Sequence, residues 1–328
     1  MKILVVAPSW VGDMVMAQSL FITLKQRHPA CQIDVIAPPW TLALTEAMPE
    51  VSKTFVMPVT RGKLGLMERI KLGQSLRSEQ YDQAILLPNT WKSALTPFFA
   101  HIPKRTGYVG ECRWGLLNDS RHLNKQVLTK TVQRFVALAY EDNAIPPCPA
   151  PLLVVDAERQ QTLIDQFGLN IEQKILALCA GAEYGEAKRW PPEYYAEVAK
   201  QKLDEGWQVC LFGSAKDKAV SEKINDLANQ QCLDFCGKTS ISDAVTLLSL
   251  ADAVVSNDSG LMHVASALNR KLIAIYGSSD PNFTPPLSDT AKIITLGLAC
   301  SPCFKRECPL GHTRCLTEIQ PERVLAEM

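Results

Sequence analysis

Residues 251–267 read Ala-Asp-Ala-Val-Val-Ser-Asn-Asp-Ser-Gly-Leu-Met-His-Val-Ala-Ser-Ala. The first part, Asp252 to Ser256, is short, apolar and β-branched, which predicts a buried strand. From Leu261 onward the apolar residues recur at helical spacing, which predicts a helix. The polar residues Asn257 to Gly260 join the two. A strand that passes so directly into a helix is typical of an α/β domain with a parallel sheet.

The hinge between this strand and helix has the composition of a phosphate site. Unpaired backbone N–H groups at a helix start favour an anion, and Ser259 and Gly260 would form the floor of the site. His263 lies one turn into the helix. Asp258 would repel a phosphate, so we expect it to bind a ligand hydroxyl or a neighbouring N–H. An ordinary Asx or Ser N-cap with a surface histidine fits the same residues, and both interpretations stay open here.

Length and composition indicate a globular protein of two domains. The chain has 328 residues, of which 47% are hydrophobic and 21% charged, so it is neither disordered nor too small for two cores. The apolar runs are too short to span a membrane. Pro8 and Asp13 interrupt the N-terminal run that resembles a signal peptide. We therefore expect a cytoplasmic protein.

The charges balance overall but not along the chain. The 34 basic and 34 acidic residues cancel, which argues against nucleic acid as a partner. From Arg61 to Arg134, however, the sequence contains 13 Lys or Arg residues and only 5 Asp or Glu residues. This surplus would attract an anionic substrate to the first half, although a solvated basic face is the simpler alternative.

The first half begins with a predicted β–α unit. It comprises a strand from Lys2 to Ala7, the loop Pro8 to Asp13 and a helix from Met14 to Arg27. The loop lacks G-x-G-x-x-G, so we expect no nicotinamide or flavin cofactor. Asp13 is either a helix cap or a carboxylate directed into a cleft. Further strands are predicted at 33–37, 55–58, 81–88 and 102–108, and helices at 62–77 and 93–99. The segment that follows the strand at 102–108, up to residue 134, is expected to be irregular and exposed.

A proline-rich segment divides the chain. Four of the seven residues from 145 to 151 are proline, which indicates a linker between domains at residues 1–150 and 151–328. In the second domain, strands are predicted at 175–179, 208–212, 234–236 and 272–276 and helices at 192–205, 217–230 and 242–250. Their alternation indicates a second parallel sheet.

Three polar loops follow predicted strands of the second domain, at 180–191, 213–216 and 257–260. Because carboxyl ends of parallel strands meet at one edge, we expect these loops to form one ligand site. Small residues beside the cations Lys188 and Arg189 suit a diphosphate. An exposed segment that leads into a helix would also carry such cations, so this alternative stays open. The chain has no Asp-x-Asp pair, so we expect lysine and helix N-termini to hold the diphosphate instead of a bound metal.

Several long motifs resemble those of one family. They are P-S-W-V-G-D-M at 8–14, L-P-N-T-W-K-S-A-L at 87–95, G-A-E-Y-G-E-A-K-R-W-P at 181–191, F-G-S-A-K-D at 212–217 and N-D-S-G-L-M-H-V-A at 257–265. Together they resemble the bacterial lipopolysaccharide heptosyltransferases, which are inverting glycosyltransferases of family 9. The resemblance implies the α/β GT-B architecture, in which two Rossmann-like doubly wound domains face each other across a cleft.

The resemblance implies a reaction and its substrates. ADP-L-glycero-D-manno-heptose would bind the second domain as a substrate, with no cofactor or metal, and the lipid A inner core would bind the first domain at the inner face of the cytoplasmic membrane. The acceptor would be the first heptose of heptosyl-Kdo2-lipid A. A family member acting on another core position is the alternative, and a nucleotide-sugar epimerase or a non-catalytic binding module would be a different class.

The resemblance also implies roles for individual residues. Asp13 would be the general base that takes the acceptor proton, and Lys188 would stabilise the departing ADP. The implied donor-binding residues are Ser9, Gly181, Lys188, Gly213, Thr239, Asp258, Ser259, Gly260 and His263. Basic residues that could meet acidic groups of the acceptor are Arg61, Lys63, Lys92, Arg105 and Arg113. The loop after Gly213 lacks the acidic residue found in a relative, so no nucleotide-binding carboxylate is assigned there.

Eleven cysteines without a secretory signal predict reduced thiols. Seven are scattered and read mostly as small core residues. The other four, Cys300, Cys303, Cys308 and Cys315, cluster near the end of the chain with His312 among them. Their spacing is not that of a paired C-x2-C knuckle, so reduced thiols are expected and a structural zinc is the alternative.

Overall fold

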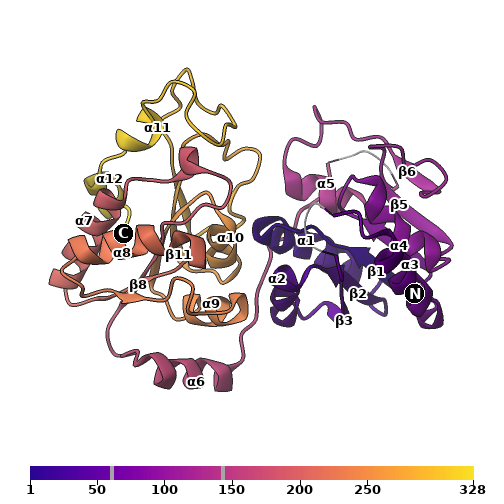
Figure 1. Cartoon of the computed structure of the whole chain (residues 1–328), viewed down its shortest axis with the longest axis horizontal. Coiled ribbons are helices and arrows are strands. Elements are labelled where there is room, and N and C mark those ends of the chain that lie inside the picture. Colours follow the sequence, from indigo (N-terminus) through magenta and orange to yellow (C-terminus); the bar gives the residue numbers. More distant parts are fainter. Residues whose placement is uncertain (60–62, 142–144) are drawn as a thin grey trace. The chain divides into compact units, whose positions relative to one another are not determined.

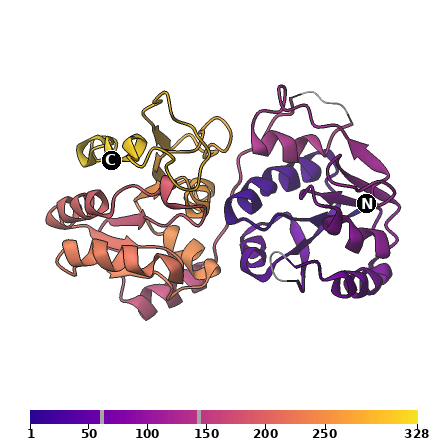
Figure 2. The same ribbon diagram turned by 45° about the horizontal axis from the view of Figure 1, so that its top comes forward.

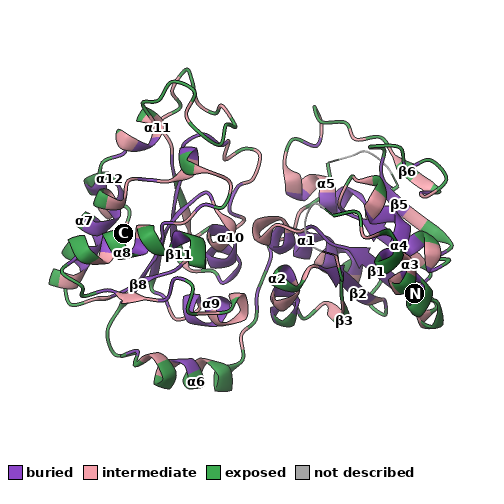
Figure 3. Cartoon of the chain, in the orientation of Figure 1, coloured by how far each residue is buried: buried purple, intermediate pink, exposed green. Residues whose placement is uncertain are grey.

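The computed structural model describes residues 1–59, 63–141 and 145–328. The chain forms two compact units, Met1–Pro151 and Leu152–Met328. In each unit, helices flank one sheet (Figures 1 and 2). The strands that form these sheets are mostly buried, whereas helices such as α6 (Ala157–Phe167) are largely exposed (Figure 3). Among the described residues, no helix is long and apolar enough to cross a membrane.

The first unit contains a six-stranded parallel sheet in the order β3-β2-β1-β4-β5-β6. Apolar residues of β1 and its neighbours form the centre of the core. The strands are β1 (Lys2–Val6), β2 (Gln32–Ala37), β3 (Val51–Val56), β4 (Gln83–Leu86), β5 (Lys104–Tyr108) and β6 (Asp119–Arg121). The helices are α1 (Val11–Arg27), α2 (Pro39–Leu42), α3 (Leu66–Ser75), α4 (Leu95–Phe99) and α5 (Thr131–Ala137), with 3-10 turns η1 (Ala43–Ala47), η2 (Leu76–Glu79) and η3 (Trp91–Ala94).

The segment that was expected to be irregular carries two elements. Strand β6 has a charged sequence, Asp-Ser-Arg, and is an edge strand that pairs in parallel with β5. Its side chains are half-buried or exposed, so they need not be apolar. Helix α5 buries Val132, Phe135 and Val136. The prediction for residues 109–134 was therefore wrong at both elements, because polar edge strands and short helices give weak periodic signals.

The second unit repeats the architecture with the strand order β12-β11-β10-β7-β8-β9, again all parallel. The strands are β7 (Ile175–Cys179), β8 (Gln208–Leu211), β9 (Leu233–Asp234), β10 (Ala253–Asn257), β11 (Lys271–Ile275) and β12 (Ala291–Ile294). Besides α6, the helices are α7 (Pro192–Asp204), α8 (Lys218–Leu227), α9 (Ile241–Leu248), α10 (Gly260–Ala267), α11 (Arg314–Thr317) and α12 (Pro321–Leu325), with 3-10 turns η4 (Glu186–Lys188) and η5 (Ala215–Asp217).

A single buried side chain joins three segments of the second core. Asn257, the last residue of β10, is fully buried. Its Oδ1 accepts hydrogen bonds from the Trp190 amide and the Tyr195 hydroxyl, both at 3.0 Å, and its Nδ2 donates to the Ala180 carbonyl at 2.7 Å. Trp190 and Tyr195 are also fully buried and pack edge to face, with ring centroids 4.9 Å apart. The loop after β7 and the start of α7 are therefore bonded to the end of β10.

We predict that Asn257→Ala destabilises the second unit by about 3 kcal/mol, because each buried polar group left without a partner costs roughly 1–3 kcal/mol. Tyr195→Phe removes one donor and should cost about 1 kcal/mol. Hydrogen–deuterium exchange in urea, read on peptides covering residues 175–200, measures this unit separately from the first. Equal protection in Asn257→Ala and the parent would refute the role of the amide.

Candidate active site

The polar loops of the second unit meet at one edge of its sheet. Strands β7, β8 and β10 are adjacent and parallel, so their carboxyl ends lie together. Gly181 follows β7, Gly213 follows β8, and Asp258 follows β10 directly. The structure thus brings together the three loops that the sequence predicted to form one site.

Lys188 and Asp258 form an ion pair at the centre of this edge. The Lys188 ammonium group contacts Asp258 Oδ2, and the two side chains are 17% and 5% exposed. The Asp258 amide donates to the Ile275 carbonyl at 3.1 Å, which fixes the backbone beside β11. We expected Asp258 to bind a ligand hydroxyl or a neighbouring N–H, and in the structure an N–H of the Lys188 ammonium donates to its carboxylate. The pair reduces the repulsion that a lone carboxylate would exert on an anion.

The start of α10 has the features of an anion site. Ser259 occupies the N-cap position, but its side chain makes no capping bond and its hydroxyl lies 3.3 Å from that of Ser256. The backbone N–H groups at Gly260 and the next residues are the helix-start donors that favour an anion. The alternative of an ordinary side-chain cap does not describe this helix.

His263 is buried, contrary to the alternative that placed it on the surface. Burial lowers the pKa of its imidazole to about 4; the negative charge of Asp258 opposes this shift and the positive charge of Lys188 adds to it. The ring is therefore neutral at pH 7 and adds no charge to the site. A neutral imidazole both donates and accepts one hydrogen bond.

Asp217 joins two of the loops and was missed by the sequence analysis. Its carboxylate accepts bonds from the amide and hydroxyl of Ser214, at 3.0 and 2.7 Å, and pairs with Arg189 at 3.3 Å. A Cβ on Gly181 would lie 2.5 Å from Asp217 Cγ, and one on Gly213 would lie 2.9 Å from Asp217 Cβ. Both glycines, predicted to bind the donor, thus also permit close packing against Asp217. The Ser-x-x-Asp capping box was the available signal.

A segment near the end of the chain, residues 301–306, packs on the loop that carries Lys188; we call it the C-terminal strap. The Tyr184 hydroxyl donates to the Phe304 carbonyl at 2.7 Å, and the Ala187 amide donates to the Arg306 carbonyl at 2.9 Å. The Lys188 ammonium lies 5.0 Å from the centre of the Tyr184 ring. The strap thus supports the backbone that leads into the predicted catalytic lysine.

Of the four C-terminal cysteines, Cys303 lies within this strap, Cys300 and Cys308 lie close to its ends, and Cys315 lies on α11; all eleven cysteines are free thiols. Burial and the neighbouring cysteines raise the pKa of Cys315, whereas backbone N–H groups lower the pKa of Cys308. In the described part of the chain, no three His, Cys, Asp or Glu side chains form a group that could hold a metal ion.

The remaining predicted catalytic and donor residues lie on other elements. Asp13 is half-buried in the first turn of α1, whose N-cap is Trp10, so Asp13 is not the N-cap. Ser9 precedes this helix, and its carbonyl accepts from the Trp40 indole at 2.8 Å. Thr239 is half-buried in the loop after β9, and its hydroxyl lies 3.5 Å from the Phe235 carbonyl.

Two of the basic residues assigned to the acceptor have structural partners within the first unit. Arg113 is only 3% exposed and donates to the carbonyls of Pro88, at 2.8 Å, and Tyr108. Arg105 donates to the carbonyls of Ile102 and Leu116, both at 2.6 Å. These guanidinium groups hold loops of the first unit, and their assignment to the acceptor stays a prediction.

The other assigned cations differ in accessibility. Lys63 is exposed, and Lys92 is half-buried in η3. Arg61 lies outside the described residues.

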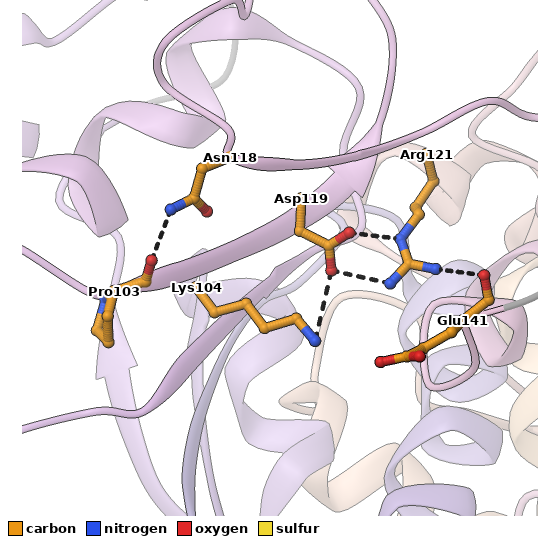
Figure 4. A pocket seen from close by; sticks show the side chains of 6 residues that line it. All are labelled: Pro103, Lys104, Asn118, Asp119, Arg121 and Glu141. Atoms are coloured by element: carbon orange, nitrogen blue, oxygen red, sulfur yellow. Dashed lines mark hydrogen bonds and ion pairs between the residues drawn. The ribbon is translucent and has the colours of Figure 1, made fainter.

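A shallow pocket of 450 Å³ in the first unit contains none of the predicted site residues. It is lined by Pro103, Lys104, Asn118, Asp119, Arg121 and Glu141 (Figure 4). Asp119 pairs with Arg121 at 2.7 Å and with Lys104 at 3.6 Å. Because its charges pair with each other, this pocket has little attraction left for an anionic ligand.

Comparison with known proteins identifies the family. A family model described as "Glycosyltransferase family 9 (heptosyltransferase)" matches residues 69–314. The chain is 48% identical to lipopolysaccharide heptosyltransferase 2 of Escherichia coli strain K12, over all of this chain and 97% of that protein. It is 46% identical to lipooligosaccharide heptosyltransferase 2 of Haemophilus influenzae, over all of this chain and 98% of that protein.

The fold agrees with this match. The solved structure of E. coli ADP-heptose lipopolysaccharide heptosyltransferase II superposes with a TM-score of 0.89 at 46% identity, covering all of this chain and 97% of that one. This similarity confirms the predicted α/β fold of GT-B type. On the strength of its sequence and its fold, the chain belongs to glycosyltransferase family 9, the heptosyltransferases.

Proposed function

We propose that this chain transfers L-glycero-D-manno-heptose from ADP-heptose to the first heptose of the lipopolysaccharide inner core, with inversion at the anomeric carbon. The observation that carries the proposal is the full-length identity of 46–48% to heptosyltransferase 2 proteins. The Lys188–Asp258 pair beside the start of α10 supports it, because a diphosphate needs a cation and backbone donors.

The donor binds the second unit in this proposal. Lys188 and the backbone donors at Ser259 and Gly260 hold the diphosphate, while Asp258 and the neutral His263 bind hydroxyl or phosphate oxygens. Gly181, Gly213 and Thr239 form the wall of the donor pocket, and Ser9 is a further donor-binding residue. As the bond between the anomeric carbon and the diphosphate oxygen breaks, negative charge grows on ADP. Lys188 and the α10 dipole stabilise that charge.

Asp13 acts as the general base. The acceptor hydroxyl oxygen attacks the anomeric carbon, its proton passes to the Asp13 carboxylate, and the electron pair of the breaking bond leaves with ADP. A carboxylate in the first turn of α1 can receive the proton directly. Inversion follows because the acceptor attacks the face opposite the leaving diphosphate.

The proposed reaction uses no cofactor or metal, since Lys188 and the helix N-terminus supply the positive charge. The acceptor is the lipid A inner core at the inner face of the cytoplasmic membrane, so the protein works in the cytoplasm and meets that membrane peripherally. Lys63 and Lys92 are the accessible cations of the first unit assigned to acidic groups of the acceptor. Nucleic acid is not a partner.

We predict that Asp13→Asn lowers kcat by roughly 10²–10⁴, with the KM for ADP-heptose changed little, because only the proton acceptor is lost. The assay is product mass after incubation with ADP-heptose and Kdo2-lipid A that bears one heptose. Glu197→Gln, which alters an exposed carboxylate on α7, is the matched control and should retain full activity.

The same assay tests the acceptor. Heptose should be added to the monoheptosylated lipid and not to heptose-free Kdo2-lipid A. Addition to the heptose-free lipid alone would move the assignment to the preceding transfer step. Transfer that persists in Asp13→Asn at the parent rate would exclude Asp13 as the base.

We predict that Lys188→Met lowers kcat/KM for ADP-heptose on the order of 10–100-fold, as expected for one charge-assisted hydrogen bond of about 1.5–3 kcal/mol. It also leaves Asp258 buried without its partner and should reduce stability. The double variant Lys188→Met/Asp258→Asn should regain stability without regaining activity, which separates the two effects. Lys223→Met, at an exposed ion pair with Glu193, is the control. Parent-like kinetics in Lys188→Met would exclude the proposed diphosphate contact.

A further inference from the structure

Two buried serine hydroxyls next to the candidate site have no hydrogen-bond partner. Ser278 and Ser279 follow β11 and are 1% and 5% exposed. Neither Oγ atom has a hydrogen-bond partner. A hydroxyl buried without a partner costs free energy, so such groups are rare and call for an explanation.

The position of these serines connects them to Lys188 and Asp258. The Ser278 amide donates to the carbonyl of Ala187, the residue before Lys188, at 3.3 Å. Strand β11 pairs with β10, and its last residue, Ile275, accepts the Asp258 amide. The serine loop therefore begins beside Asp258 and bonds to the backbone beside Lys188.

Unpaired buried groups of the second unit concentrate at this edge. Those found among the described residues are Arg189 Nε, Ser266 Oγ, Ser278 Oγ and Ser279 Oγ. Three of these four follow strands β7 or β11 at the carboxyl edge. Ser266 differs because it lies on α10, six residues or about 9 Å beyond the helix start. Packing defects would be spread through the core, whereas most of these unpaired polar groups lie at one edge of the sheet. This clustering is what we expect at a ligand-binding site.

We propose that Ser278 and Ser279 are donor-binding residues whose hydroxyls bond to the heptosyl diphosphate of ADP-heptose. The proposal rests on the placement of the donor at this edge. Diphosphate and sugar oxygens accept hydrogen bonds from hydroxyl groups, and sugar hydroxyls also donate to them. A hydroxyl that has no hydrogen bond in the free protein breaks none when it bonds to a ligand oxygen.

This role makes stability and binding respond in opposite directions. A serine that served the fold would lose a bond on substitution by alanine, and the protein would become less stable. Here alanine removes an unpaired hydroxyl, so the protein without substrate should be as stable or more stable. Binding of the donor should weaken at the same time, which is the trade-off expected at functional sites.

The experiment compares Ser278→Ala, Ser279→Ala and their double variant with the parent. We expect the double variant to have an unchanged or higher Tm without ligand, a KM for ADP-heptose raised about tenfold, and a kcat changed less than twofold. Inhibition by ADP locates the contact. An equal loss of ADP affinity assigns the hydroxyls to the diphosphate, whereas unchanged ADP affinity assigns them to the heptose.

Ser266→Ala is the matched control, because it removes a similar unpaired hydroxyl and should leave the donor KM unchanged. A donor KM within twofold of the parent in the double variant would overturn the proposal, whatever its Tm. If Lys188→Met still weakens donor binding in that case, the donor site stands and only the serine contacts fall. If neither substitution affects the donor KM, the placement of the donor itself is wrong.

Discussion

The hydrogen bonds of the Asn257 side chain are the constraint from which the candidate site follows. They join the end of β10 to Ala180, Trp190 and Tyr195. Lys188 lies two residues before Trp190, and Asp258 follows Asn257 directly. Because the backbone N–H of Trp190 is bonded to the side-chain oxygen of Asn257, Lys188 and Asp258 are held close to each other. A buried polar contact that is fully satisfied specifies one arrangement, whereas apolar packing alone tolerates several.

The electrostatics of the edge suit a substrate that gains negative charge during the reaction. Lys188 and Asp258 nearly cancel each other, and His263 is neutral because burial lowers its pKa. The partial positive charge at the N-terminus of α10 is then the main electrostatic attraction for an anion at this edge. In the proposed function, a ligand diphosphate shares Lys188 with Asp258, so the lysine stays in place as negative charge grows on the leaving group. Such preorganisation is the main electrostatic contribution of an enzyme to the transition state.

Sequence predicted the parts of this protein in which local pattern and burial agree. The apolar strands β1, β7 and β10 and the loops after them were found because a parallel sheet needs continuous apolar runs. Strand β6 was not predicted, because an edge strand can be polar and then lacks an apolar pattern. The burial of Arg113 could not be predicted from sequence, because the carbonyls that its guanidinium group contacts are distant along the chain. Asp217 lay in a recognisable capping box, but its packing against Gly181 and Gly213 depends on contacts distant in sequence.

The C-terminal strap has a consequence for the order in which this enzyme is built. Tyr184 and Phe304, which it bonds together, are 120 residues apart in the sequence. A ribosome makes these residues at about 5–20 per second, so Lys188 emerges several seconds before the residues that support its loop. The first unit and most of the second sheet can form in that interval, but the loop around the lysine gains its final contacts only when the strap arrives. The final arrangement of the loop around Lys188 is thus one of the last features that the growing chain acquires.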